Sequence, residues 1–578
     1  MRLNTDGYDE HKPAVVINNL AFRYKTQTQG QALQKINLQI AQGEFVMVMG
    51  PSGAGKSTLA HCLNGLIPNF IRGQYEGKVE IFGLNPAKQK VSAMARVIGL
   101  VFQDFEAQLF STNTRLEIVF GPENFKVPRG EMEKIIAEVV QLVNLDGLED
   151  RQPATLSGGQ KQRLAIGSVL AIRPKVICMD EPTTDLDPLG KAGIFQLAKE
   201  LHRDKKLTLL VIEHETEEAL FADRIIILDK GRVLADDKPA RLLKEVDLFA
   251  GIGIMPLQIP SYFLRLGIPR EALPLTPREG WEKFGALPLA IDERKYRSLE
   301  EQDQARAERY GEIILSARGL QYVYPGGAKV LKGIDLDIRQ GEFMAVLGRN
   351  GSGKTTLVKH FNGLLKPIAG KVAVCGRDVA AGTVFEAGKE VGYVFQNPDH
   401  QIFSDTVYDE VAFSLQMRGF PQSEIKELVE DALRAVDLEG SGQQDPFRLT
   451  KGERQRVAVA AVLAAKPQVI ILDEPTTGLD YQEQRRMMEL VKRLNEKGHT
   501  IIMITHTMWV VAEYAHRIAL MRDGLLTMCG ATRAVLRAEG ELASACLKVP
   551  QIVKLSNLLG HTALSVEELL YCTVRAGE

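Results

Sequence analysis

Residues 156–187, LSGGQKQRLAIGSVLAIRPKVICMDEPTTDLD, decide the fold class of this 578-residue chain. A small polar turn precedes a stretch that predicts an amphipathic helix, with a buried side of Leu164, Ile166, Val169 and Leu170. Arg173-Pro174 predicts the end of that helix, because a residue before proline avoids the helical conformation. The apolar residues 176–179 then predict a strand that delivers Asp180 and Glu181 to its carboxyl end, where open α/β sheets place their ligands. Taken alone, two such carboxylates also fit an ordinary acidic loop, but in this setting they suit an Mg²⁺ ligand beside a general base.

The motifs of this chain occur twice. GPSGAGKST at 50–58 returns as GRNGSGKTT at 348–356, and DEPTT at 180–184 returns at 473–477. The offset is 298 (354 − 56) at the lysines and 293 (473 − 180) at the aspartates, so the first copy carries about five extra residues, within 67–77. A loop insertion of that size costs little stability. The repeat therefore predicts two copies of one domain.

The GxxxxGK[ST] motif follows an apolar strand in each copy and is a phosphate-cradling loop. Lys56 and Lys354 are expected at the β- and γ-phosphates, and Ser57 and Thr355 on Mg²⁺. The loop itself does not exclude GTP. The expected nucleotide-binding residues are Gly50, Pro51, Ser52, Gly53, Ala54, Gly55, Lys56, Ser57 and Thr58 in the first copy, and Gly348, Arg349, Asn350, Gly351, Ser352, Gly353, Lys354, Thr355 and Thr356 in the second.

These motifs together resemble the ATP-binding cassette (ABC) family. The resemblance implies an Mg-dependent ATPase with an α/β fold, made of two P-loop NTPase (ABC) cassettes in tandem. Each cassette would have a RecA-like α/β core, an antiparallel β subdomain, a helical subdomain and a small C-terminal helical appendix. The appendix is itself doubled, because residues 257–267 have a counterpart at 548–560. The expected boundaries are 14–247 for ABC ATPase domain 1, 248–291 for its appendix, 292–311 for a charged linker, 312–540 for ABC ATPase domain 2 and 541–578 for its appendix.

The resemblance also assigns roles to single residues. Glu181 and Glu474 would orient or deprotonate the attacking water, and Asp180 and Asp473 would hold Mg²⁺. The remaining catalytic candidates are the switch histidines and the glutamines that touch Mg²⁺ and water: His214, His506, Gln103 and Gln396. The expected metal ligands are Ser57, Gln103, Asp180, Thr355, Gln396 and Asp473. An aromatic stacks on adenine in this family, and Tyr24 and Tyr324 stand at that place; the alternative is that these rings pack on the sheet.

The signature turn differs between the copies. Ser157, Gly158, Gly159 and Gln160 are replaced by Thr450, Lys451, Gly452 and Glu453. In the family, two cassettes close head-to-tail, and each ATP lies between one phosphate loop and the other cassette's signature turn. The resemblance therefore implies cassette pairing within this chain and makes both signature turns nucleotide-binding. Because Lys451 adds a charged side chain where a glycine usually sits, we expect two working but unequal sites.

The stretches that follow the two glutamines resemble the ATPase components of energy-coupling factor (ECF) transporters, which import vitamins and metal ions. That resemblance implies two partners, an integral membrane scaffold subunit and a small membrane substrate-binding subunit, and a peripheral location on the cytoplasmic face of the cell membrane. An apolar and acidic surface there suits a groove that grips a helix. Its expected lining is Phe110, Phe120, Phe403 and Phe413, whose alternative is packing within the helical subdomain. The first copy departs from the ECF pattern at Glu117-Ile-Val.

Net charge and the lengths of the apolar runs bear on which partners this chain can have. The net charge is −2, which gives no electrostatic case for a nucleic-acid partner. No run of about 18 apolar residues is present, so a membrane role would be by docking. The linker 292–311 is charge-balanced and predicts an exposed linker or a solvated helix. Soluble twin-cassette proteins of the ribosome or of DNA repair usually carry a long basic arm there, so that alternative is disfavoured; a conventional ABC transporter ATPase is the nearer one.

Overall fold

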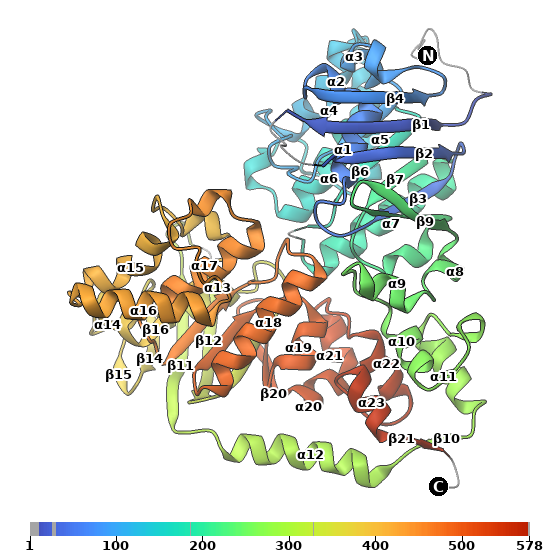
Figure 1. The fold of residues 1–578 in the computed structure, drawn as a ribbon. Helices are drawn as coiled ribbons and strands as arrows, with labels where there is room; N and C mark the ends of the chain where they lie inside the picture. The colour runs from blue at the N-terminus through green and yellow to red at the C-terminus, as the bar shows by residue number, and fades with distance from the viewer. Residues whose placement is uncertain (1–10, 26–29, 185, 328, 576–578) are drawn as a thin grey trace. The chain divides into compact units, whose positions relative to one another are not determined.

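The computed structural model describes residues 11–25, 30–184, 186–327 and 329–575. These residues form two compact units. Unit 1 comprises the described residues up to Pro260 together with Pro269–Leu275, and unit 2 comprises Ser261–Ile268 and the described residues from Thr276 onward. Figure 1 shows mixed α/β layers in both.

The central sheet of unit 1 has the strand order β5-β6-β7-β3-β8-β9 and is parallel except for β9. Strands β3, β6 and β7 are buried along their whole length. Parallel strands covered on both faces read as continuous apolar runs, which is why these segments lack alternation. The strand bounds are Phe45–Met49 (β3), Ile98–Val101 (β5), Val176–Asp180 (β6), Thr208–Ile212 (β7), Arg224–Asp229 (β8) and Arg232–Asp237 (β9).

A second, antiparallel sheet of unit 1 has the order β2-β1-β4. Its strands are Val15–Tyr24 (β1), Leu33–Ile40 (β2) and Gly73–Ile81 (β4). Three helices, α4, α5 and α6, follow β5 and share one apolar cluster with the central sheet. The helix bounds of unit 1 are Lys56–Asn64 (α1), Leu66–Asn69 (α2), Val91–Met94 (α3), Thr114–Asn124 (α4), Arg129–Leu142 (α5), Gly158–Leu170 (α6), Pro188–Lys205 (α7), Pro239–Leu242 (α8) and Val246–Gly251 (α9).

Unit 2 repeats this topology. Its central sheet has the order β16-β17-β18-β13-β19-β20, and its antiparallel sheet has the order β12-β11-β14-β15. The strands are Ile313–Val323 (β11), Lys329–Arg339 (β12), Phe343–Leu347 (β13), Ala369–Val374 (β14), Arg377–Asp378 (β15), Val391–Val394 (β16), Val469–Asp473 (β17), Thr500–Ile504 (β18), Arg517–Arg522 (β19) and Leu525–Ala531 (β20). The helices are Lys354–Phe361 (α13), Val384–Glu390 (α14), Val407–Met417 (α15), Gln422–Ala435 (α16), Lys451–Leu463 (α17), Tyr481–Glu496 (α18) and Met508–Tyr514 (α19).

The stretch that opened the sequence analysis folds as it predicts. Its four apolar positions are buried on α6, and β6 ends at Asp180. The helix ends at Leu170, three residues earlier than the Arg173-Pro174 pair implies. Arg173 has a φ of +57°, so the chain has already left the helix before the proline.

The two C-terminal tails meet within unit 2. Helices α11 (Pro277–Gly285) and α22 (Gln551–Leu558) pack together, and β10 (Leu289–Ile291) pairs antiparallel with β21 (Thr573–Arg575). The Tyr262 and Thr573 hydroxyls lie 2.7 Å apart, and Arg265 donates to Glu567 at 2.6 Å. Two parts of the tail that follows the first copy, Ser261–Ile268 and the residues from Thr276 onward, therefore fold with the second copy, whereas Pro269–Leu275 belong to unit 1. The other tail helices are Gln258–Arg265 (α10), Thr532–Arg537 (α20), Glu539–Ser544 (α21) and Val566–Cys572 (α23).

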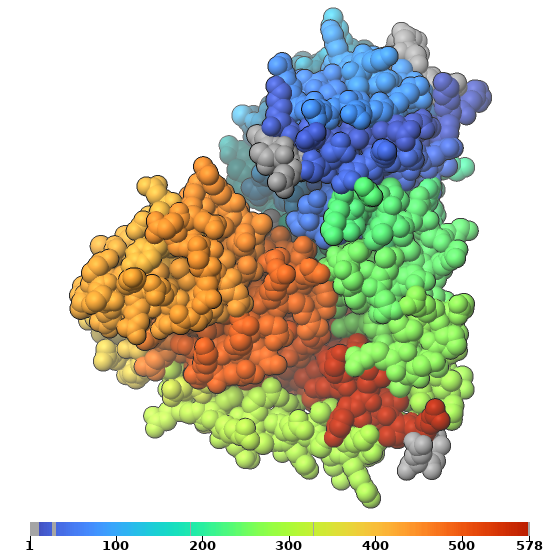
Figure 2. Space-filling view, viewed as in Figure 1, coloured from blue at the N-terminus to red at the C-terminus, as the bar shows by residue number. Residues whose placement is uncertain are grey.

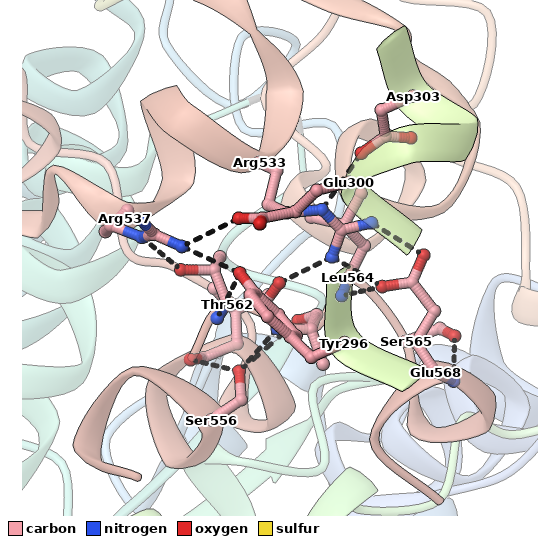
Figure 3. Close-up of polar contacts among 12 residues, drawn as sticks. Tyr296, Glu300, Asp303, Arg533, Arg537, Ser556, Thr562, Leu564, Ser565 and Glu568 are labelled. Carbon is pink, nitrogen blue, oxygen red and sulfur yellow. Dashed lines mark hydrogen bonds and ion pairs between the residues drawn. The ribbon is translucent and has the colours of Figure 1, made fainter. Parts of the chain in front are cut away.

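The linker is a helix, α12 (Glu293–Glu308), whose outer face lies on the surface (Figure 2). Its N-cap is Asp292, which accepts hydrogen bonds from two backbone N–H groups of the first turn. Tyr296 is buried, and its hydroxyl accepts hydrogen bonds from Arg537 at 2.7 Å and from the Thr562 N–H at 3.2 Å (Figure 3). The linker is therefore docked along one face and solvated along the other.

Across the described ranges, no helix is both long enough and apolar enough to cross a membrane.

Candidate functional site

The first phosphate loop joins β3 to α1. Gly55 has a φ of +100°, and a Cβ there would lie 2.4 Å from the Ala32 carbonyl oxygen, so only glycine fits. The Lys56 ammonium is buried and donates to the carbonyl oxygens of Gly50 at 2.9 Å and Pro51 at 3.0 Å. The lysine thus holds its positive charge inside the loop, at the N-terminal end of α1, where both charge and helix dipole favour phosphate.

The second phosphate loop has the same build between β13 and α13. Gly353 has a φ of +101°, and Lys354 donates to the carbonyl oxygens of Gly348 at 2.8 Å and Arg349 at 2.9 Å. The repeated sequence therefore forms the same phosphate cradle in both units.

The two candidate adenine-stacking tyrosines lie beside these loops. The Tyr24 hydroxyl is 2.9 Å from the Thr58 hydroxyl, and the Tyr324 hydroxyl is 3.2 Å from that of Thr356. Phe22 and Tyr322 pack edge-on against the two rings at centroid distances of 4.9 and 5.0 Å. These contacts join each tyrosine to the first turn of the phosphate-loop helix.

The two candidate catalytic glutamates stand in a strained backbone conformation. Glu181 has a φ of +46° and Glu474 a φ of +50°, a region that residues other than glycine rarely adopt. Each N–H is fixed by a neighbouring strand, since Glu181 donates to the Ile212 carbonyl at 3.0 Å and Glu474 to that of Ile504 at 2.9 Å. Such strain persists only where the surroundings over-determine it, and it clusters at functional sites.

A histidine contacts each glutamate. His214 Nε2 lies 2.8 Å from Glu181 Oε1, and His506 Nδ1 lies 3.0 Å from Glu474 Oε2. Burial alone would raise the pKa of both carboxyls. The adjacent histidine, together with the phosphate-loop lysine, instead lowers the pKa of each glutamate below its usual value. Both glutamates are therefore held as carboxylates, the form that orients or deprotonates a water.

The neighbouring aspartates fit a hard cation. Burial raises the pKa of Asp180 and of Asp473, opposed by hydrogen bonds from Ser57 to Asp180 and from Tyr393 and Thr355 to Asp473. Within the described residues, Asp180 Oδ1 is buried with no hydrogen-bond partner. A buried carboxylate oxygen beside a hydroxyl is the donor set that Mg²⁺ takes, completed by phosphate and water. In the described ranges, no group of three His, Cys, Asp or Glu side chains is arranged to hold a metal ion.

The two glutamines differ. Gln103 donates to Glu181 Oε2 at 2.6 Å, so it lies at the candidate catalytic carboxylate. For Gln396 the structure records no hydrogen bond among the residues that it describes, and the side chain is exposed. The first copy thus brings all of its candidate catalytic residues into contact, whereas in the second the contact recorded within the described residues is between His506 and Glu474.

The signature turns keep one geometry despite their different sequences. Ser157 and Gln160 form a capping box at the start of α6, and Thr450 and Glu453 form the same box at the start of α17. A Cβ built on Gly478 would lie 2.3 Å from the Lys451 ammonium, so the lysine lies across the loop that follows Glu474. The corresponding residue of the first copy, Asp185, lies outside the described residues. The altered signature therefore changes charge rather than backbone shape.

Three polar side chains at the site were not predicted from the sequence. The Thr184 hydroxyl donates to Glu181 at 3.3 Å, the Thr477 hydroxyl donates to Glu474 at 3.0 Å, and Tyr393 donates to Asp473. The threonines carry a usable signal, because Pro-Thr-Thr follows the carboxylates in both copies. Tyr393 has no such signal, since the first copy has Leu100 at its place.

The phenylalanines after the glutamines form two exposed pairs. Phe110 and Phe120 stack edge-on with ring centroids 4.5 Å apart, and Phe403 and Phe413 do so at 4.8 Å. Phe110 and Phe403 are 63% and 61% exposed, so these rings are not packed inside a helical subdomain. In unit 2 the pair lines a pocket of about 250 Å³ with Tyr393, Gln401 and Arg418.

One acidic residue in each of these stretches is buried and holds the loop that carries the first phenylalanine, and is not part of the exposed surface. Glu117 is buried and accepts hydrogen bonds from the N–H groups of Phe110 and Ser111 at 3.1 and 2.7 Å. Glu410 does the same for Phe403 and Ser404, both at 3.0 Å. Glu117 is thus the structural counterpart of Glu410, and the residue before it differs between the copies, Leu116 in the first and Asp409 in the second.

Comparison with known proteins identifies a matching family and similar proteins. A family model described as ABC transporter matches residues 33–184 and 331–477. A Caldanaerobacter subterraneus protein, provisionally named an ABC transporter ATP-binding protein, is 62% identical over 97% of this chain and 99% of its own length. A Methanosarcina acetivorans protein with the same provisional name is 37% identical over 98% of this chain and 93% of its own. A solved structure of CbiO1 from Clostridium perfringens, titled part of an ABC transporter complex, is 35% identical and covers 42% of this chain and 97% of its own, with a TM-score of 0.38.

Proposed function

The chain belongs to the ABC transporter family of ATP-binding proteins and is an ABC-type ATPase, and on that premise we propose that it is the energy-coupling subunit of an ECF-type importer of a vitamin or metal ion. The observation that carries the proposal is the exposed phenylalanine pair that follows the catalytic glutamine in both copies. Edge-on aromatic pairs left open to solvent favour a partner that covers them. A helix of a membrane scaffold subunit is the partner we propose, with a small membrane protein that binds the substrate. The chain would then lie peripherally on the cytoplasmic face of the cell membrane.

The proposed chemistry uses the same residue types in both units. Lys56 and Lys354 bind the transferred phosphoryl group, and Glu181 and Glu474 orient the attacking water and take up its proton. His214 and His506 fix the glutamates through the contacts described above. Mg²⁺, held by the loop hydroxyl and the aspartate of each copy, would supply charge neutralisation at the phosphates. The complete set in both copies supports hydrolysis at two sites.

Movement would come from pairing of the two cassettes on ATP. Each copy carries a complete phosphate loop and a capped signature helix, which is what pairing in this family requires. Closure on ATP and opening after hydrolysis would move the helices held by the phenylalanine pairs and so couple the ATPase to transport.

The test is purification of the tagged chain from detergent-solubilised native membranes, with the partners identified by mass. We expect a scaffold-like membrane subunit and a small apolar membrane protein. Phe110→Ser with Phe120→Ser, or Phe403→Ser with Phe413→Ser, should lose both partners while the isolated chain still hydrolyses ATP.

The matched control is Phe221→Ser, which removes a ring of similar exposure, 52%, from the surface of unit 1 outside the pair. It should retain the partners. Recovery of ribosomal or DNA-repair proteins with nothing from the membrane would overturn the transporter role and leave the ATPase intact. A conventional ABC permease pair in place of the scaffold and small subunit would overturn the ECF assignment.

A further inference from the structure

One side chain distinguishes the metal site of unit 2 from that of unit 1. The Tyr393 hydroxyl donates a hydrogen bond to Asp473 Oδ2 at 2.6 Å, and the Thr355 hydroxyl donates to the same oxygen at 3.2 Å. A short O–H···O⁻ bond to a charged acceptor is among the stronger hydrogen bonds in proteins. Asp473 is therefore fixed from two sides, by the phosphate-loop helix and by β16.

The first copy lacks this support. Leu100 pairs with Cys178 in β5–β6 at the register where Tyr393 pairs with Ile471 in β16–β17. A leucine cannot donate a hydrogen bond, so Asp180 keeps the hydrogen bond from Ser57, the counterpart of Thr355, and receives none from Leu100. The two aspartates thus sit at equivalent strand ends in different hydrogen-bonding surroundings.

Tyr393 also lines the pocket of unit 2 described above, which is the proposed groove for a partner helix. It borders the pocket that Phe403 and Phe413 line, and its ring packs edge-on against Phe395 at 5.0 Å. A tyrosine ring is rigid and has two side-chain torsions, so a shift of the ring in the pocket wall also shifts the hydroxyl at Asp473. No other side chain with a recorded hydrogen bond to Asp473 in the described ranges borders that pocket.

We propose that Tyr393 is a positioning residue for the metal ion of the second site: it orients Asp473 for cation binding and connects that aspartate to the wall of the groove. It makes the two sites unequal in metal affinity, independently of the altered signature turn. The connection to the groove rests on the proposed function, because it matters only if a partner occupies that pocket. Orientation of Asp473 does not rest on it.

The test measures metal binding rather than turnover. Mn²⁺ would be titrated into the full chain with a non-hydrolysable ATP analogue, with bound and free Mn²⁺ separated by electron paramagnetic resonance. Tyr393→Phe keeps the ring and removes only the hydroxyl. Because groups that orient a metal ligand typically contribute tenfold or more to affinity, we expect about tenfold weaker binding at one of two classes of sites. Analogue binding in EDTA should be unchanged.

Two further variants assign the effect. In a Lys354→Ala background, which removes nucleotide binding at the second site, Tyr393→Phe should no longer alter Mn²⁺ binding. Tyr514→Phe is the matched control, because it deletes a similar tyrosine–carboxylate hydrogen bond, to Glu489 at 2.7 Å, elsewhere in unit 2. It should leave the Mn²⁺ titration unchanged.

Equal Mn²⁺ affinities in wild type and Tyr393→Phe, or the same loss in Tyr514→Phe, would overturn the positioning role. The groove connection is tested on the purified membrane complex, where partner binding should change Mn²⁺ affinity at the second site in wild type and not in Tyr393→Phe. An equal change in both proteins would refute the connection between Tyr393 and the groove. Failure to isolate any complex would count against the proposed function alone, since the titration of the free chain still decides the orientation of Asp473.

Discussion

Replacing Arg533 with methionine is expected to lower the free energy of unfolding of unit 2 by about 3 kcal/mol. Arg533 lies on α20, and its side chain is 6% exposed. The guanidinium donates to both carboxylate oxygens of Glu568, at 2.8 and 3.1 Å, and to Asp303 of the linker helix α12 at 2.9 Å (Figure 3). Burial alone would lower the pKa of Arg533, but these two carboxylates raise it, so the group is a buried cation.

The magnitude follows from what remains after the substitution. Removing one partner of a buried ion pair costs about 3–5 kcal/mol, because the other charge is left unpaired. The side chains of Asp303 and Glu568 are 22% and 24% exposed, so both can regain water. That places the cost at the lower end of the range. The carbonyl oxygen of Thr562 also loses a donor.

Tryptophan fluorescence follows this unit selectively. The chain has two tryptophans, and both Trp281 and Trp509 lie in unit 2. We expect the fluorescence-detected Tm to fall by about 5 °C in Arg533→Met. The control is Arg537→Met, since that arginine also contacts the linker region but its side chain is 55% exposed. Its loss should stay within about 1 kcal/mol.

Equal Tm shifts in the two variants, or a higher Tm in Arg533→Met, would refute the reasoning. A higher Tm would mean that desolvation of the ion cluster outweighs its Coulombic attraction, a result known for some buried ion networks. ATP turnover per folded molecule should be unchanged, because none of the candidate site residues belongs to this cluster.

Two further predictions concern the sites and the pH dependence of stability. Single-turnover ATP hydrolysis should differ between Glu181→Gln and Glu474→Gln, and Lys451→Gly should change the rate of the Glu474→Gln protein but not of the Glu181→Gln protein; identical rates throughout would argue that the sites are equivalent. Burial and the nearby charge of Arg306 lower the pKa of His516 from 6.5 to about 3. A base with a lowered folded-state pKa loses stability as the pH falls from about 6.5 toward 3, at up to about 1.4 kcal/mol per pH unit. His516→Asn should flatten that part of the unit 2 unfolding curve measured by tryptophan fluorescence, and an unchanged slope would show that His516 does not titrate there.

Several elements of the candidate site could be predicted from the sequence because short sequence motifs encode them. The phosphate loops, the strand-end carboxylates and the Ser157 capping box each depend on neighbouring residues in a fixed pattern. The repeat then tells functional positions from chance ones, since Glu181 and Glu474 stand at the same place in two copies. The positive φ of these glutamates has no sequence signal of its own, because glutamate is not a residue type that favours it.

The features that could not be predicted from the sequence depend on tertiary contacts. Arg533 is one of two arginines in a six-residue helix, and contacts with α12, with α23 and with the loop before α23 surround its guanidinium. Tyr296 stands in a charged segment that predicts a solvated helix, yet its ring is buried against the tail. Much of the tail that follows the first copy folds into unit 2, with pairings more than 280 residues apart in sequence, such as Leu289 with Arg575. No periodicity within either segment encodes such a partner.

The two copies also show where inequality between the sites can arise. The sequence points to the signature turn, but Thr450 and Glu453 keep the capping box of Ser157 and Gln160, so the backbone there is alike. The larger differences lie around the carboxylates. Gln103 contacts Glu181, whereas Gln396 has no recorded hydrogen bond in the described ranges; Tyr393 holds Asp473, whereas Leu100 cannot hold Asp180. We therefore place the proposed inequality at the carboxylate end of each sheet, and a protein whose second signature turn, Thr450–Glu453, is replaced by SGGQ should still bind metal unequally at its two sites.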